Sequence, residues 1–387
     1  MPHAATLVGS MRTLLPFIAL VLLAHSIGFS QSAKDLNLTT GKEIFDATCA
    51  GCHGVDGKGQ PQTTLGFEPP ASFPDFTDCN GSTREGGQQW SSVIHDGGRA
   101  RAFTEIMPSF GPAKNPLLTD DEIWKVIGYV RTFCAEDAKW PRGDFNFPRP
   151  MFTDKAFPED ETVLTTAINT NGTSGLMSDL NVEKRYGAAN NLAFHFRTGF
   201  NQLPSGSWAG GLGDIGIEWK RVLFTSLKTG TILSGAGGVS LPTGDPKRGL
   251  GNGITTTEGF LALGQILPSQ SFIQQQVGIE GPPFRRHDTL SDVYSRTAVG
   301  KTFAQERGFG RAWTFMAEMI AERALGPSER WGIDAVPQMQ VTLSRRQHIR
   351  LGLGYSIPAM NVGDRQKQFV FYLLWDRFDG SLKEGWR

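Results

Sequence analysis

The residues with the clearest chemical potential are two cysteines followed by a histidine. Cys49, Ala50, Gly51, Cys52 and His53 form a C-x-x-C-H pattern. In this pattern the thiols form thioethers with the vinyl groups of a porphyrin, and the histidine ligates the iron. Two anchors three residues apart on the end of a helix direct the following imidazole at the iron. The pattern therefore predicts one covalently attached haem c.

Two other chemistries use a C-x-x-C pair. A thioredoxin-like redox pair needs a βαβ context, and a zinc site needs a second cysteine pair at similar spacing. The other cysteines of this chain, Cys79 and Cys134, are isolated singles. Haem attachment is therefore the favoured interpretation, and the absence of a second C-x-x-C-H from the sequence excludes a long chain of haems.

Two helices are predicted around this pattern. Thr40 and Glu43 form a capping box, and the helix that they start leads directly into Cys49. A second capping box, formed by Thr119 and Glu122, opens a helix with apolar periodicity that continues to Val130.

With these elements in place, residues 34–140 resemble a class I cytochrome c. The resemblance rests on the C-x-x-C-H motif, on a loop with Met107 and Phe110 before the last helix, and on Gly41 and Phe45, which would cross that helix at Tyr129. It implies that Met107 and His53 are the two axial ligands, which leaves no open position on the iron. A thioether ligand raises the reduction potential and favours an electron carrier over an enzyme. His95 as the second ligand, and Met107 as a plain core residue, are the alternatives.

The first thirty residues are predicted to be a signal peptide. Arg12 precedes the apolar run Leu14–Ala24, which is too short to span a bilayer, and Gly28–Ser30 suits signal peptidase. A membrane anchor is the alternative, and Met11 is a second possible start. In an oxidising exported compartment, Cys79 and Cys134 are expected to form a disulfide, with two separate thiols as the alternative.

Composition limits the remaining possibilities. The chain has 387 residues, with 38 basic and 38 acidic side chains, so whole-chain charge gives no reason to expect a nucleic-acid partner. The 47 glycines and 10% aromatic residues suit β structure. Residues 141–160 are turn-rich and are interpreted as a linker, and from residue 161 to 387 the hydrophobic period changes to two.

This period predicts about twelve antiparallel strands. Leu192, Phe194 and Phe196 alternate with polar residues, and the predicted last strand, Phe369–Phe378, would direct Phe369, Phe371, Leu373 and Trp375 toward lipid. Strand length, small residues on the polar face and export favour an outer-membrane β-barrel over a soluble periplasmic sandwich, which stays the alternative. The predicted strands begin near residues 161, 176, 190, 212, 229, 257, 270, 291, 311, 333, 346 and 367, with longer loops at Leu241–Gly253 and Glu280–Leu290.

A second resemblance concerns short turns. Gly211–Ile215 with Lys220, and Leu241–Pro246 with Gly249–Gly251, resemble motifs of outer-membrane barrels associated with phenol and other aromatic degradation pathways. The resemblance implies a barrel rather than a particular substrate. Such barrels usually end on an aromatic residue, whereas this chain continues past Phe378 to Trp386 and Arg387.

The complete prediction is a multidomain chain: a signal peptide (1–30), an all-α class I cytochrome c domain (34–140), a linker (141–160) and an antiparallel outer-membrane β-barrel (161–387). The expected function is one-electron exchange with a redox partner protein in the periplasm, without enzymatic activity. One alternative is a transporter for small hydrophobic compounds with a redox-sensing haem domain. The other is an enzyme, such as a haem peroxidase or the electron-accepting part of a dehydrogenase with its catalytic site in the β region. Eight polar residues are expected in the lumen, as a packed polar interior or as a selective site: His195, Arg197, Glu218, Lys220, Glu318, Glu322, His348 and Arg350.

Overall fold

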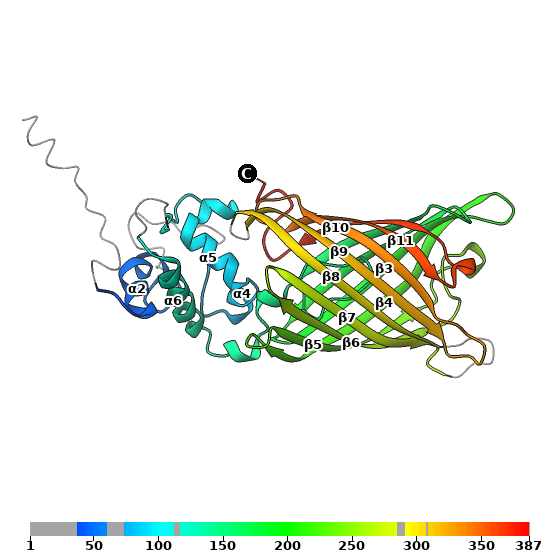
Figure 1. The fold of residues 1–387 in the computed structure, drawn as a ribbon, viewed down its shortest axis with the longest axis horizontal. Coiled ribbons are helices and arrows are strands. Elements are labelled where there is room, and N and C mark those ends of the chain that lie inside the picture. The colour runs from blue at the N-terminus through cyan, green and yellow to red at the C-terminus, as the bar shows by residue number, and fades with distance from the viewer. Residues whose placement is uncertain (1–36, 60–72, 112–116, 285–290, 307–308, 387) are drawn as a thin grey trace, which may run out of the picture.

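The computed structural model describes residues 37–59, 73–111, 117–284, 291–306 and 309–386. The predicted signal peptide and residues 34–36 lie outside these ranges, as does most of the predicted loop at 280–290. A small helical region sits at one end of a long β-barrel (Figure 1). The fold class predicted from the sequence, a helical region followed by a twelve-stranded antiparallel barrel, is confirmed.

Short helices form the first region. Its three longer helices are α2 (Gly41–Thr48), α5 (Gly87–Asp96) and α6 (Asp120–Val130). Both predicted capping boxes are present, at the start of α2 and at the start of α6. The remaining helical segments are α3 (Ala50–His53), α4 (Cys79–Ser82), η1 (Gly98–Arg101), η2 (Arg131–Phe133), η3 (Asp137–Lys139) and η4 (Gly143–Phe145).

The predicted crossing of α2 and α6 is confirmed. A Cβ atom added to Gly41 would lie 2.1 Å from the carbonyl oxygen of Lys125, so only glycine allows this approach. The rings of Phe45 and Tyr129 meet edge to face with centroids 5.4 Å apart. Ile44, Phe45, Ile123 and Ile127 form the centre of the small apolar core.

The barrel is closed, and each strand pairs with its neighbours in the sequence. The seam joins β1 to β12, with Glu161 opposite Asp376 and Asn169 opposite Gln368. The strands are β1 (Glu161–Asn169), β2 (Gly175–Tyr186), β3 (Asn190–Gln202), β4 (Trp208–Ser226), β5 (Thr231–Leu241), β6 (Thr256–Leu267), β7 (Ser271–Gly281), β8 (Asp292–Glu306), β9 (Phe309–Ala324), β10 (Gly332–Thr342), β11 (Ile349–Met360) and β12 (Gln368–Asp376).

Each predicted strand start lies within four residues of the observed one. The largest difference is at β4, which starts at Trp208 rather than 212, because Gly210 and Gly211 carry no side chains that could reveal an alternation. The predicted loop at Leu241–Gly253 is confirmed by the interval between β5 and β6. Among the described residues, no helix is long and apolar enough to span a bilayer.

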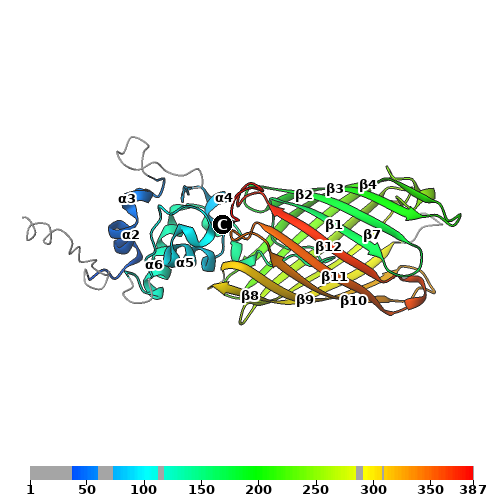
Figure 2. The same cartoon turned by 90° about the horizontal axis from the view of Figure 1, so that it is seen from above.

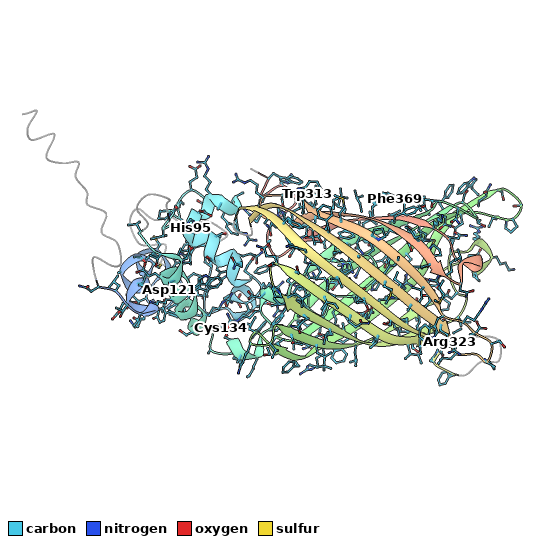
Figure 3. The ribbon with its side chains drawn as sticks, in the orientation of Figure 1. His95, Asp121, Cys134, Trp313, Arg323 and Phe369 are labelled. Atoms are coloured by element: carbon cyan, nitrogen blue, oxygen red, sulfur yellow. A yellow bond between two sulfur atoms is a disulfide. The ribbon has the colours of Figure 1, made fainter. Side chains whose placement is uncertain are left out.

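The outer face of the barrel is apolar. On β12, Phe369 and Leu373 are exposed while Val370, Tyr372 and Leu374 point inward and are buried, as the alternation predicted. Trp313, Phe315 and Met319 form an equivalent exposed row on β9. Figure 3 labels Trp313 and Phe369 on this outer surface. An apolar outer face around a polar interior is typical of barrels that lie in lipid.

The two ends of the barrel differ. At the end next to the helical region the strands are joined by short turns, such as 187–189, 227–230 and 268–270. At the opposite end the connections include 242–255, 325–331 and 361–367. Strand β1 begins and strand β12 ends next to the helical region, as expected for an even number of strands. The C-terminal end of the chain lies at the same junction (Figure 2).

Candidate functional site

The C-x-x-C-H motif lies where α2 passes into α3. Cys49 is the C-cap of α2 and the N-cap of α3, and its backbone N–H donates to the carbonyl of Phe45 at 2.8 Å. The backbone N–H groups of Cys52 and His53 both donate to the carbonyl of Cys49, at 3.1 and 2.9 Å. A single hydrogen-bonded turn therefore fixes the positions of the two thiols and the imidazole relative to one another.

The two thiols of this turn are free. The disulfide of the chain joins Cys79 to Cys134, as predicted, with Cα atoms 5.1 Å apart. Cys49 is partly buried and Cys52 is exposed. Burial raises the pKa of the Cys49 thiol above its ordinary value. Both sulfur atoms thus remain available for bonds to another group.

The His53 side chain has the properties of a metal ligand. Burial lowers its pKa to about 4, so the imidazole is neutral at pH 7 and keeps a nitrogen lone pair. The ring is stacked on Phe73, with centroids 4.8 Å apart, and contacts Phe76 at 4.9 Å. Its Nδ1 is buried without a hydrogen-bond partner among the described residues. Two free thiols, a neutral imidazole and aromatic walls fit a covalently bound haem.

Met107 lies in the loop between η1 and α6, and this loop is held against the end of α5. The backbone N–H of Gly98 donates to the Met107 carbonyl at 3.1 Å, and the N–H of Gly111 donates to the His95 carbonyl at 3.0 Å. Gly97 has a φ of +83°, and a Cβ atom there would lie 2.9 Å from the Met107 carbonyl oxygen. The Met107 backbone is therefore fixed by several contacts, and this position of the loop depends on a glycine at 97.

His95, the alternative ligand, has local partners. Its Nδ1 contacts the carboxylate of Asp96, and its carbonyl accepts a hydrogen bond from the Ser109 hydroxyl at 2.6 Å. A Cβ atom added to Gly111 would lie 2.0 Å from the His95 ring. These contacts give His95 a role in holding the Met107 loop.

The motif lies far from the barrel within the helical region. Figures 1 and 2 both place α2 at the end of the molecule opposite the barrel, and Figure 2 places α3 beside it. Helix α4 lies next to the barrel mouth in both views. A group bound at Cys49 and Cys52 would thus be presented on the side of the molecule that points away from the barrel.

The helical region and the barrel are joined by buried ion pairs. Arg101, which is 2% exposed, lies 2.9 Å from Glu85 of its own region and 3.4 Å from Asp379, which follows β12. Arg346, in the turn before β11, donates to the carbonyl of Ala102 at 2.7 Å. A second pair joins Arg84 to Asp160, at the start of β1. These contacts fix how the helical region sits on the barrel mouth.

Residues 145–160, most of the predicted linker, fold into the barrel lumen; we call them the plug. Phe145, Phe147 and Phe157 pack against inward-facing residues of the wall such as Phe260. The backbone N–H groups of Met151 and Asp154 donate to Gln338 and Gln276 on the wall, at 3.0 and 3.1 Å. The sequence signal for this position was the set of phenylalanines in the segment, which is too apolar for an exposed linker.

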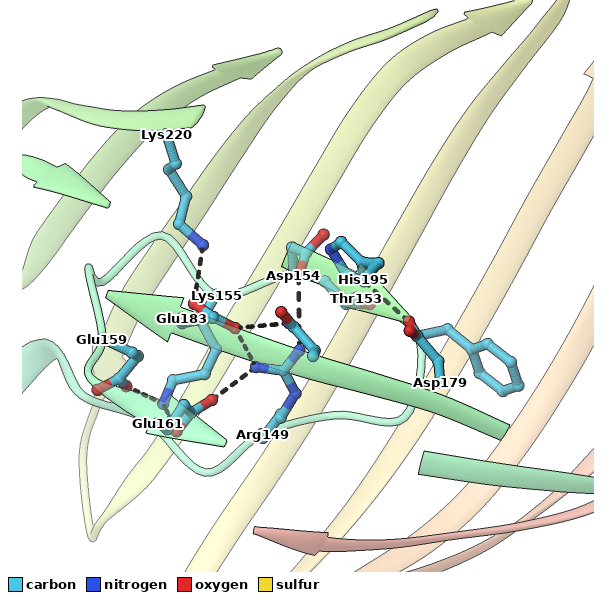
Figure 4. A network of polar contacts seen from close by, with 12 residues as sticks. Arg149, Thr153, Asp154, Lys155, Glu159, Glu161, Asp179, Glu183, His195 and Lys220 are labelled. Carbon is cyan, nitrogen blue, oxygen red and sulfur yellow. Dashed lines mark hydrogen bonds and ion pairs between the residues drawn. The ribbon is translucent and has the colours of Figure 1, made fainter. Parts of the chain in front are cut away.

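Charged residues also hold the plug (Figure 4). Arg149 lies 2.6 Å from Glu161 on β1 and 2.8 Å from Glu183 on β2. Lys155 pairs with Glu159 within the plug and lies 3.8 Å from Glu161. These ion pairs link the plug to the wall within the lumen.

The predicted lumen residues lie in four places. Lys220 and Glu318 belong to the packed interior: Lys220 lies 4.0 Å from Glu183, and Glu318 accepts hydrogen bonds from the plug backbone, including the N–H of Phe152 at 3.2 Å. His348 and Arg350 are buried at the helical end, and Glu322 pairs with Arg365 near the opposite end. His195, Arg197 and Glu218 instead line a cavity.

Comparison with known proteins identifies the helical region. Residues 38–133 match the family model of cytochrome c. No curated protein matches the chain. The helical region is thus a cytochrome c region, consistent with covalently bound haem and electron transfer.

Several solved structures of outer-membrane proteins are similar to this chain at low sequence identity. The NanC porin has 8% identity and a TM-score of 0.38, with 56% of this chain and 99% of that chain covered. An outer-membrane channel from Pseudomonas putida F1 has 10% identity and a TM-score of 0.39, with 59% and 99% covered. LpxR from Salmonella typhimurium has 9% identity and a TM-score of 0.35, with 56% and 99% covered.

Proposed function

We propose that this protein is a periplasmic c-type cytochrome that transfers one electron at a time and is tethered to the outer membrane by its barrel. The observation that carries the proposal is the position of Cys49, Cys52 and His53: they form one rigid turn at the end of the molecule opposite the barrel. From there, a redox partner protein in the periplasm can approach the site without obstruction by the barrel.

One haem c would be held by four side chains. The Cys49 and Cys52 sulfurs would attach the haem covalently, and the His53 imidazole and the Met107 thioether would bind its iron. When bound, the haem would supply an iron that is reversibly oxidised and reduced by one electron. Two protein ligands on the iron leave no position for a substrate, which supports a carrier rather than an enzyme.

The lengths of the barrel connections support this orientation. Outer-membrane barrels have short turns on the periplasmic side and longer loops outside the cell. The short turns 187–189, 227–230 and 268–270 lie at the end that carries the helical region. This supports a periplasmic position for the haem site, in the compartment where the predicted signal peptide would deliver it. A soluble periplasmic protein would instead have to expose the apolar outer face of the barrel to water.

Transport of small hydrophobic compounds, the alternative function, requires an open lumen. The plug fills the lumen at the helical end and is bonded to the wall through Arg149, Met151 and Asp154. Passage would require these contacts to break. The structure therefore favours a tether over a channel.

The test is expression of the full chain in a strain that matures c-type haem, followed by fractionation. The expected result is a haem-stained band in the outer membrane that shifts on boiling, as a closed barrel does. A Cys49→Ser/Cys52→Ser variant should lose the haem stain and keep the heat shift, and a Thr48→Ser variant is the matched control. A haem-stained band in the soluble fraction would refute the tether, and haem retained by the double variant would refute the attachment site.

A further inference from the structure

The lumen beyond the plug contains a cavity that the proposed electron transfer does not use. Its volume is about 380 Å³, within the range of small-molecule sites, and plug residues from Arg149 to Asp154 contribute to its lining. Met177 lines both this cavity and a hollow of about 610 Å³ formed by residues such as Thr173, Leu203 and Lys247 near the loops of the opposite end. The cavity thus lies next to this hollow on the side remote from the helical region, and the plug limits it on the other side.

A row of carboxylates runs across one wall of this cavity. Glu218 on β4 is opposite Gly238 on β5, Gly238 is opposite Glu258 on β6, and Glu258 is directly opposite Glu280 on β7. All four residues line the cavity. Like charges directly opposite each other on paired strands destabilise a sheet. The Tyr294 hydroxyl donates a hydrogen bond to Glu258, but Glu280 has no ion-pair partner among the described residues, and a bound cation would stabilise the two opposed carboxylates.

Several acceptor oxygens around the cavity also lack donors. Glu218 is 8% exposed and makes no hydrogen bond or ion pair of 4.0 Å or less with a described residue. On β2, which is separated from β4 by β3 alone, the Oδ1 atoms of Asp179 and Asn181 are buried without partners among the described residues. Buried acceptors without donors are costly, so a positively charged donor bound in the cavity would stabilise these oxygens.

The cationic residues of the lining are largely engaged elsewhere. Arg149 is paired with Glu161 and Glu183 of the wall. Arg197 is directly opposite Asp179 and donates to the Ser240 hydroxyl at 3.1 Å, while Arg296 donates to the carbonyl of Phe152 and stacks on Tyr294. His195 is paired with the Oδ2 atom of Asp179 at 2.8 Å. Glu218 and Glu280 are left without an ion-pair partner among the described residues.

We propose that this cavity binds a small organic cation with two or more ammonium groups, which enters from the end of the barrel remote from the helical region. The spacing favours ammonium groups over a directly coordinated metal ion. Glu218 and Glu258 are two strands apart, about 10 Å in the hydrogen-bonding direction, and no group of three metal-ligating side chains occurs in the described part of the chain. An extended diamine reaches separated carboxylates through charge-assisted hydrogen bonds.

The test is calorimetric titration of the full-length, haem-loaded protein in detergent micelles with 1,4-diaminobutane. We expect saturable binding at one site, and weaker binding by about tenfold or more in Glu218→Gln, because a charge-assisted hydrogen bond is lost. Glu280→Gln, on the adjacent part of the row, should also weaken binding, and it tests the site independently if Glu218→Gln does not fold. Each variant is first checked for the heat shift of a closed barrel.

Two comparisons decide whether the binding is specific. Glu105→Gln makes the same chemical change at an exposed position of the helical region, and we expect it to leave diamine binding unchanged. Mg²⁺ carries the same charge as the diamine and should bind more weakly. Equal binding of Mg²⁺ would show simple charge attraction and would overturn the proposal. Absence of saturable diamine binding, or full binding in folded Glu218→Gln and Glu280→Gln proteins, would also overturn it.

Discussion

The barrel buries many charged and amide side chains, whereas the core of the helical region is apolar. In the helical region the buried centre is apolar, with Ile44, Phe45 and Ile123 fully excluded from solvent. In the barrel, charged and amide side chains such as Lys220 and Gln276 are buried, and Trp313 is exposed. The first arrangement suits water and the second suits lipid outside and a polar lumen inside. The two regions are therefore built for different solvents, and most changes in one should leave the other intact.

The largest expected effect lies in the helical region alone. Replacing Met107 by leucine removes the predicted thioether ligand, so the reduction potential should fall by on the order of 0.1 V, within the range of about 0.8 V that axial ligands control. Redox titration of the purified protein measures this change, and the barrel should keep its heat shift. His95→Gln is the control on the same loop and should retain the thioether-ligated spectrum. An unchanged potential in Met107→Leu would show that Met107 is not a ligand.

A substitution at the junction should change how firmly the helical region is held on the barrel. Arg101→Ala leaves Glu85 and Asp379 buried together without their shared cation, which should weaken docking of the helical region by about 3–5 kcal/mol. Calorimetry of the full chain should show a lower melting temperature for the helical region and an unchanged one for the barrel. Arg99→Ala is the control, because the exposed pair of Arg99 with Glu105 contributes about 1 kcal/mol or less. Equal melting of both variants would show that the Arg101 pairs do not hold the regions together.

The disulfide should act only on the helical region. Cys79 and Cys134 are 55 residues apart in the sequence, so replacing both by serine releases a long loop in the unfolded chain. The free energy of unfolding of the helical region should fall by about 2–4 kcal/mol. Guanidinium unfolding followed through haem absorbance measures this change. A heat-modifiability gel on the same variant tests the barrel, whose behaviour should be unchanged. A barrel that fails to close without this disulfide would contradict the independence of the regions.

The smallest effect is a dependence of docking on pH. Burial, together with the nearby Glu85, raises the pKa of Asp379 from 3.8 to about 8. Between about pH 4 and pH 8 the docked state holds a proton that the free chain releases, so docking should weaken as the pH rises through this window. The Arg84 pair with Asp160 persists and limits the change.

Spin labels at Asp121→Cys and Ser205→Cys would report this change as a broader distance distribution at pH 8 than at pH 5. The neutral Asp379→Asn variant should abolish the difference. If the protein that keeps Asp379 gives the same distance distribution at both pH values, the raised pKa of Asp379 is contradicted.

The helix starts and the barrel strands could be predicted from the sequence, because their patterns are local or repeated. The capping boxes at Thr40 and Thr119 each involve residues three apart, and the barrel strands repeat one alternation many times. The loss of this alternation at Gly210 and Gly211 is the reason for the largest error in a strand start. Local pattern therefore accounts for most of the fold.

Contacts between distant residues had no such signal. Arg101 and Asp379 are 278 residues apart, and nothing near either residue indicates the other. The carboxylate row at Glu218, Glu258 and Glu280 appears only when the strand register is known. The position of the plug also depends on the closed barrel around it, although its phenylalanines were a usable indication.

The plug has a consequence for how the molecule can be assembled. Both of its ends lie at the helical end of the barrel: Trp140, just before it, contacts Arg185 near the end of β2, and Asp160 is followed directly by β1. The segment therefore enters the lumen and returns through the same opening. The strands can close around it without any folded domain having to be threaded through the ring. Attachment of a haem to the helical region and closure of the barrel can thus occur in either order, which leaves the cell free to mature the two regions with separate machineries.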